Sequence, residues 1–296
     1  LMPEASATLA SLSALAAMFA TAVLIPLVNP AVYIGVGSPT VWHNPTQIVA
    51  ALSALLCVFY AAHMVFILRD GQKQKAAPIT LSWEQVVLLA ALVLFSAVCK
   101  PTFLQAFLPA AGVYFLILWI KNKNQTRYFL QIILAFLPAA LYFLMQYLYY
   151  TGVVVPFTSG VAVEFSLERF WLSVRNMLMM AAFPLFALLI AAKKEDFRDP
   201  ALILCLLVAG ISVLEAAVFY ETGVRENHGN FNWASMNAAF LLWVVMLPRF
   251  IAAVQRYRYE RARLAEDAQK GAVHSDALSH AQTRLKAQSA GFLAAI

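Results

Sequence analysis

Eight apolar runs dominate the sequence, and each is close to the roughly 20 residues that a helix needs to cross a bilayer. The runs span residues 8–28, 47–68, 81–98, 103–120, 128–150, 167–192, 200–220 and 233–254. Only 12% of the 296 residues are charged, whereas a soluble domain carries about 25% charged residues. Because backbone groups in lipid must be satisfied within the segment, the runs predict helices. The sequence therefore predicts an all-α, polytopic transmembrane helical bundle of about eight spans.

The distribution of lysine and arginine predicts the orientation of this bundle. These residues concentrate in the loops that follow the second, fourth, sixth and eighth runs. The positive-inside rule then puts both termini in the cytoplasm, and the segments 29–46, 99–102, 151–166 and 219–232 outside. The net charge of +6 follows from this topology, so we expect no nucleic-acid partner. We expect a multi-pass protein of the cell inner (cytoplasmic) membrane.

The composition changes after the last run. Residues 1–254 form the expected transmembrane domain, and residues 255–296 are rich in Ala, Gln, Arg and Glu, which predicts a basic, amphipathic cytoplasmic tail that continues the last helix. The first run has no basic segment before it, so we do not expect a cleaved signal peptide. The three cysteines lie in apolar runs without metal-type spacing and are expected to pack without a disulfide.

The most polar stretch between two apolar runs is 219–233, and it is the first candidate for a working site. Glu221 or His228 can take a proton from a hydroxyl group, so both are candidate catalytic residues. Arg225 offers the forked donors that suit phosphate or carboxylate, and Asn230 offers an amide for sugar hydroxyls. The alternative interpretation of this stretch is an ordinary exterior turn.

A second polar segment, 29–46, is rich in proline and glycine and contains no Lys or Arg. Within residues 35–46 of this segment His43 is the one titratable side chain, and it is a third candidate catalytic base or anion ligand. Asn44 is a candidate substrate-binding residue beside it. The alternative is a tight turn whose histidine caps a helix.

Two cations near the predicted outer boundary complete the candidate site. Lys100 precedes Pro101, which breaks the helix, and a charge beside a broken helix tends to pair or to face a water-filled cavity. The alternative is a lysine that snorkels to the interface. Arg175 lies about two turns into its span, where it either binds substrate or forms a structural ion pair with Glu215.

Lys100, Arg225 and Arg175 would together form a cationic pocket for an anionic headgroup. A lipid-linked phosphate fits such a pocket because its tail stays in the bilayer, while a carboxylate or imidazole activates the acceptor hydroxyl. The sequence has no Asp-x-Asp motif, so we expect no metal and no cofactor.

Three motifs carry a resemblance to a known class of proteins. They are Gly-x-Gly-Ser-Pro-x-x-Trp-His-Asn-Pro-Thr at 35–46, Lys-Pro-Thr-Phe-Leu at 100–104 and Glu-x-Gly-x-Arg-x-x-His-Gly-Asn-Phe-x-Trp at 221–233. Over roughly residues 20–245 the chain resembles bacterial multi-pass proteins of surface-polysaccharide assembly, namely polyprenyl-phosphate-dependent glycosyltransferases of the GT-C kind and O-antigen polymerases. The resemblance implies membrane lipids and a polyprenyl-linked sugar phosphate as partners, with sugar transfer at the outer face.

The chain departs from the GT-C pattern at one point. Those enzymes carry an acid in their first outer loop, and the segment 29–46 has none. The acid then comes from elsewhere, or the corresponding loop lies upstream, or the chain is not such an enzyme. A multi-pass transporter or flippase and a non-catalytic membrane subunit are therefore the alternatives.

Overall fold

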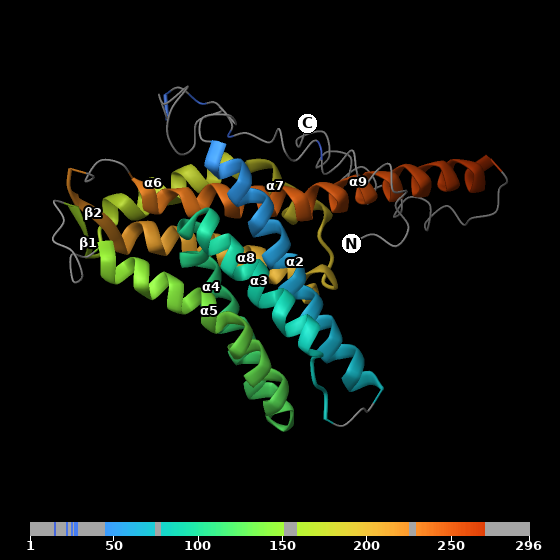
Figure 1. Cartoon of the computed structure of the whole chain (residues 1–296). Helices are drawn as coiled ribbons and strands as arrows, with labels where there is room; N and C mark the ends of the chain where they lie inside the picture. Colours follow the sequence, from blue (N-terminus) through green and yellow to red (C-terminus); the bar gives the residue numbers. More distant parts are fainter. Residues whose placement is uncertain are drawn as a thin grey trace.

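In the computed structural model the chain folds into a bundle of long helices with one short pair of strands (Figure 1). The structure describes residues 45–74, 78–150, 159–224 and 229–269, together with Leu15, Ala22, Ile25, Leu27 and Val28. Helices occupy every expected span from the second to the eighth, whereas the first expected span lies almost entirely outside the described residues.

The elements follow one another along the chain with short connections. The helices are α2 (Pro45–Lys73), α3 (Trp83–Cys99), α4 (Pro101–Lys121), α5 (Thr126–Tyr150), α6 (Leu167–Met180), α7 (Ala182–Ala191), α8 (Pro200–Val218) and α9 (Trp233–Gln269). Three single 3-10 turns are η2 (Lys123–Gln125), η3 (Asp196–Arg198) and η4 (Asn230–Asn232). The strands are β1 (Ser159–Val163) and β2 (Phe219–Gly223).

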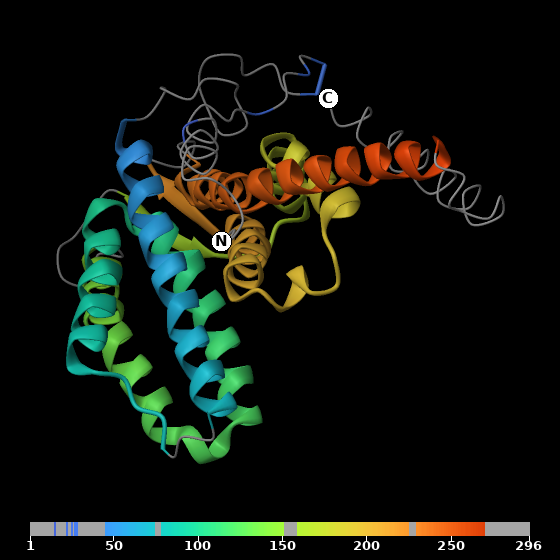
Figure 2. The same ribbon diagram turned by 90° about the vertical axis from the view of Figure 1, so that its right-hand side faces the viewer.

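The helices form two sets that cross each other. Figures 1 and 2 show α2 to α5 running alongside one another, while α8 and α9 lie across them. Direct contacts join α3 to α5 within the first set and α8 to α9 within the second, and both α8 and α9 contact α2 and α4, so both helices link the two sets. The buried core is built mainly from alanine, leucine, valine and phenylalanine side chains at these crossings.

Length and composition make this a membrane-embedded helical protein. Among the described residues, five helices are long and apolar enough to cross a membrane, and α6 with α7 makes a sixth if the bent pair is one span. The helix α3 is apolar but has only 17 residues. Apolar side chains on α5 face outward, as lipid contact requires: Leu130, Ile133, Leu134, Leu137, Leu141 and Leu144 are all exposed.

The expected sixth span, residues 167–192, is not one continuous helix. It breaks at Ala181 into α6 and α7, which are bent by 68° relative to each other. Pro184 has no N–H to donate to the carbonyl of Met180, four residues earlier. The indole Nε1 of Trp243 in α9 donates to that carbonyl instead, at 3.0 Å. The break therefore leaves no unsatisfied group at Met180.

The expectation of a purely helical chain is also wrong in one place. Residues 159–163 and 219–223, both predicted to be loops, pair as the antiparallel strands β1 and β2, with Val161 opposite Glu221. The α8 helix ends at Val218 rather than at Tyr220 because the chain enters β2. Two backbone bonds extend the pairing, since the amides of Glu164 and Ser166 donate to the carbonyls of Val218 and Ala217.

The loops assemble at two opposite ends, as the alternation of charge predicts. At one end lie β1, β2, η4 and Lys100, and we call this the strand end; in Figure 1 it is where α5 and α8 finish and α6 and α9 begin. At the other end Arg69 of α2 donates to the carbonyl of Arg198, and Gln72 donates to Asn122. We call this second end the η3 end.

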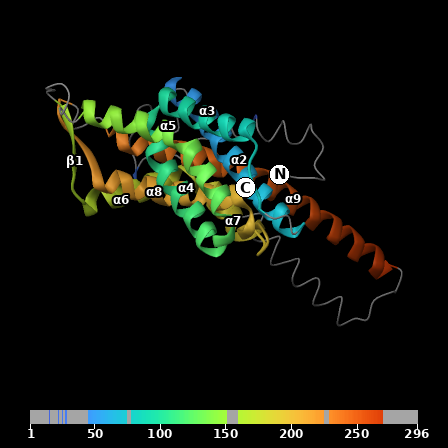
Figure 3. The ribbon, with the colours of Figure 1, turned by 60° about the horizontal axis from the view of Figure 1, so that its bottom comes forward.

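The last helix extends well beyond the others. Figures 1 and 3 show α9 projecting past the bundle on the side of the η3 end. Its 37 residues correspond to about 55 Å of helix, against a hydrocarbon core of about 30 Å. The helix continues to Gln269 without a break at residue 254, in agreement with the predicted helical continuation.

Candidate functional site

Four of the predicted site residues lie outside the described part of the chain. These are His43, Asn44, Arg225 and His228. The candidate site is therefore built from the predicted residues that the structure describes: Lys100, Arg175, Glu221 and Asn230.

Lys100 occupies the break between α3 and α4, where the sequence predicts one. Its backbone is extended, with φ −163° and ψ 110°, because the following Pro101 excludes the helical conformation. The ammonium Nζ lies 5.0 Å from the ring centroid of Trp233, the first residue of α9. Partial burial lowers the pKa of Lys100 to about 8. The cation is held against an indole face, which is the most favourable partner for such a contact.

Glu221 is held in place by hydrogen bonds from the side chain of Asn230. Both carboxylate oxygens of Glu221 accept from Nδ2 of Asn230, each at 2.8 Å. Glu221 is buried in the centre of β2, and Asn230 begins η4. Gly229 precedes Asn230 with φ 61°, a left-handed conformation that glycine adopts without strain. The carboxylate therefore has a fixed position at the strand end.

These contacts bring three predicted residues to one end of the bundle. Asn230 holds Glu221, and three residues later Trp233 contacts Lys100. A carboxylate and a cation thus flank the single turn η4.

Arg175 does not join this group. Its guanidinium donates to the carbonyl of Val28 at 3.0 Å and to Oδ1 of Asn176. It lines an open, mostly apolar groove of about 420 Å³ together with Trp171, Leu178 and Met179. The alternative of an ion pair with Glu215 is wrong, since the guanidinium has turned away toward Val28. The ion pairs Lys73–Asp70, Arg249–Asp196 and Arg249–Asp199 of the described residues do not include Arg175.

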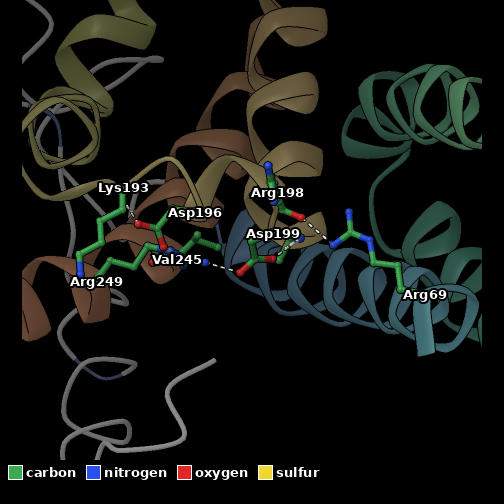
Figure 4. A network of polar contacts seen from close by, with 8 residues as sticks. Arg69, Lys193, Asp196, Arg198, Asp199, Val245 and Arg249 are labelled. Atoms are coloured by element: carbon green, nitrogen blue, oxygen red, sulfur yellow. Dashed lines mark hydrogen bonds and ion pairs between the residues drawn. The ribbon is translucent and has the colours of Figure 1, made fainter. Parts of the chain in front are cut away.

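The densest charge network lies at the η3 end, and the sequence analysis missed it (Figure 4). Arg249 of α9 forms ion pairs with Asp196, at 3.2 Å, and with Asp199, while its side chain is only 11% exposed. It also donates to the carbonyl of Val245 at 2.7 Å. The signal was available in the sequence, because Arg249 is a lone cation inside the last apolar run and two acids lie in the loop before α8.

This network serves the packing of the helices. Asp199 caps α8 by accepting from the amide of Ala201 at 2.7 Å, and Asp196 accepts from the amide of Lys193. Each acid therefore binds a backbone amide as well as Arg249. The network therefore anchors α9 to the loop between α7 and α8, and its carboxylates already have hydrogen-bond partners.

Metal ligands do not gather in the part of the chain that the structure describes. No group of three or more His, Cys, Asp or Glu side chains there could hold a metal ion. The cysteines Cys57, Cys99 and Cys205 are free thiols.

No family model, curated protein or solved structure matches the chain. The class of protein is therefore defined by the fold and composition alone: a membrane-embedded helical protein that holds a carboxylate and a cation at one end.

Proposed function

We propose that this protein is a polyprenyl-phosphate-dependent glycosyltransferase or polysaccharide polymerase that acts at the outer face of the cytoplasmic membrane. The observation that carries the proposal is the arrangement at the strand end, where Lys100 lies against Trp233 and Glu221 is fixed by Asn230. A cation and a carboxylate at a helix boundary are the groups that a lipid-linked phosphate donor and a hydroxyl acceptor require.

The proposed reaction assigns one role to each group. The phosphate of the lipid-linked sugar binds near the Lys100 ammonium, which stabilises the negative charge that develops as the bond from the sugar C1 to the phosphate oxygen breaks. The acceptor hydroxyl oxygen forms the new bond to C1, and its proton passes to the Glu221 carboxylate. Asn230 is a positioning residue that orients this carboxylate. The electron pair of the broken bond leaves with the lipid phosphate.

A binding measurement tests the role of Lys100. The purified full chain would be titrated with undecaprenyl phosphate, and with undecaprenol as the uncharged control, by native mass spectrometry. We expect the wild type to prefer the phosphate, and Lys100→Met to lose that preference because the cation is gone. Equal binding of both lipids to the wild type, or an unchanged preference in Lys100→Met, would contradict the proposal.

A transporter is the second candidate, and the break between α6 and α7 favours it. Broken helices line the substrate sites of many transporters, and the break at Ala181 follows the groove that Arg175 lines. The two functions differ in chemistry, since a transporter would leave the lipid-linked sugar intact. Recovery of the unmodified lipid-linked sugar after incubation with the wild type would favour transport.

A further inference from the structure

Glu215 is a buried carboxyl group without a partner. It lies in α8, one turn before that helix ends at the strand end, and is only 5% exposed. Both of its carboxylate oxygens are shielded from solvent, and neither has a hydrogen-bond partner in the described structure. Buried polar side chains are nearly always hydrogen-bonded, so such a group needs a physical explanation.

The cations on the elements that pack around α8 do not neutralise Glu215. Arg169 of α6 donates to the carbonyl of Ala217 and lies over the Tyr220 ring, 4.5 Å from its centroid. Arg175 is turned toward Val28, and none of the ion pairs among the described residues includes Glu215. The remaining charged groups that the structure describes at this end are Lys100 against Trp233, Glu221 with Asn230, and the exposed Glu164 and Glu168.

The other helices in contact with α8 bring no charge to this level. Counted from the strand end, the first charged side chain of α2 is Arg69 and the first of α9 is Arg249. Both lie at the η3 end. Cys57, Tyr60 and His63 are the titratable side chains of α2 before Arg69. In α4 the first charge after Lys100 is Lys121, at the far end of that helix.

Buried hydroxyl groups lie about one turn from Glu215 along the helices, and none of those described is bonded to it. Ser212 lies three residues earlier on the same face of α8, and it accepts from the hydroxyl of Ser235 in α9 at 3.3 Å. Ser173 of α6 is fully buried, and its Oγ has no partner among the described residues. Since Arg169 contacts Ala217 and the two helices run in opposite directions, Ser173 lies close to the level of Ser212.

An ionised carboxylate in this position would be far more costly than the neutral acid, because no opposite charge or donor compensates it. A metal ion or an ammonium group cannot reach oxygens that the packed helices shield, whereas a proton adds no volume. We infer that Glu215 is a proton-binding site: the packing of α6, α8 and α9 holds it as a neutral carboxylic acid, and its ionisation requires the strand end of this interface to open. The inference concerns a separate site and holds whether or not the chain transfers sugar.

Infrared spectroscopy of the full chain in lipid nanodiscs tests the protonation directly. The carbonyl stretch of a protonated carboxyl group lies above the amide and carboxylate bands and shifts in heavy water. We expect this band at neutral pH in the wild type and in Glu221→Gln, and we expect Glu215→Gln to lose it. If Glu215→Gln does not insert, Glu215→Asp should move the band. A wild-type spectrum that differs from the Glu215→Gln spectrum only in a carboxylate band would overturn the inference.

Cysteine accessibility tests the coupled opening. Ser173→Cys would be introduced after the three native cysteines are replaced by alanine, and its reaction with a small water-soluble maleimide would be followed against pH. As pH rises, we expect the rate of maleimide reaction at Ser173→Cys to increase several-fold more than the rate at the exposed control Ser82→Cys. Adding Glu215→Gln should abolish this difference between the two positions. The same pH dependence at both positions, or no effect of Glu215→Gln, would overturn the coupling.

Discussion

A single amide nitrogen, Nδ2 of Asn230, lies 2.8 Å from both carboxylate oxygens of Glu221. The contact spans the part of the chain between β2 and η4 and fixes the carboxylate at the strand end. The donor in this contact is a neutral amide. This distinguishes Glu221 from Asp196 and Asp199, whose charges are compensated by Arg249.

Loss of the Asn230 amide should slow the proposed transfer without unfolding the protein. A hydrogen bond to a charged group contributes about 1.5–3 kcal/mol, so we expect Asn230→Ala to lower turnover about tenfold to a hundredfold. The KM for the lipid-linked donor should change little, since Lys100 is untouched. The matched control is Asn232→Ala in the same turn, because the two described hydrogen bonds to Glu221 come from Asn230. Equal losses in both variants would argue against a positioning role.

The pH dependence of lipid phosphate binding should follow the ionisation of Lys100. Its pKa is lowered to about 8, so the ammonium is present below this value and is lost as pH rises through it. Binding of undecaprenyl phosphate should therefore weaken as the pH rises from about one unit below the pKa of Lys100 to about one unit above it. The phosphate is already largely ionised over this range, so its own charge changes little.

The control for this titration is Lys100→Arg. A guanidinium stays charged throughout the range, so the variant should retain phosphate binding at the alkaline end. A wild type and a Lys100→Arg variant with the same pH profile would show that another group controls the binding.

The bond from Trp243 to Met180 should stabilise the break between α6 and α7. Trp243→Phe keeps the ring stacked on Phe183, whose centroid is 4.6 Å away, but leaves the Met180 carbonyl without its donor. We expect the free energy of unfolding in mild detergent to fall by about 1–3 kcal/mol. Pro184→Ala restores an N–H that can bond Met180, so the two substitutions together should cost less than the sum of each alone. Additive effects would contradict this account.

The network at the η3 end should be the most sensitive charge cluster for stability. Arg249→Met leaves the partly buried Asp196 and Asp199 without their cation, so we expect a loss of up to about 3 kcal/mol, the lower end of the range for a fully buried pair. Lys73→Met is the matched control, because the Lys73–Asp70 pair is exposed and should be worth about 0–1 kcal/mol. Adding Asp196→Asn and Asp199→Asn to Arg249→Met should recover part of the loss. Denaturant titrations of the wild type, the two single cation variants and the triple variant measure these losses of stability. Equal losses in Arg249→Met and Lys73→Met would refute the prediction.

Apolar run length alone predicted the positions of the helices from α2 to α9 and the assembly of alternate loops at opposite ends. It could not predict which proline breaks a helix. Pro109 and Pro138 lie inside continuous helices, whereas the segment around Pro184 bends by 68°. At Pro184 the carbonyl of Met180 accepts from Trp243, a donor in a distant part of the chain.

The sequence also did not predict the partners of the charged side chains. Arg175 and Glu215 lie at suitable depths on neighbouring helices, but the rotation of each helix about its axis decides what the side chain meets, and apolar composition does not encode it. The pairing of β1 with β2 depends on the same long-range packing. By contrast, the break at Lys100 follows from one local rule, the effect of proline on the residue before it.

The most direct test of the proposed function is the fate of lipid-linked sugar precursors in a host that depends on this protein. The host would carry Glu221→Gln, which removes the charge while keeping an oxygen for the Asn230 amide, with membrane insertion confirmed. The matched control is Glu164→Gln, an exposed carboxylate at the same end. We predict accumulated precursor and lost surface polymer with Glu221→Gln, and normal amounts of both with Glu164→Gln. Normal precursor and polymer in the inserted Glu221→Gln protein would contradict the account.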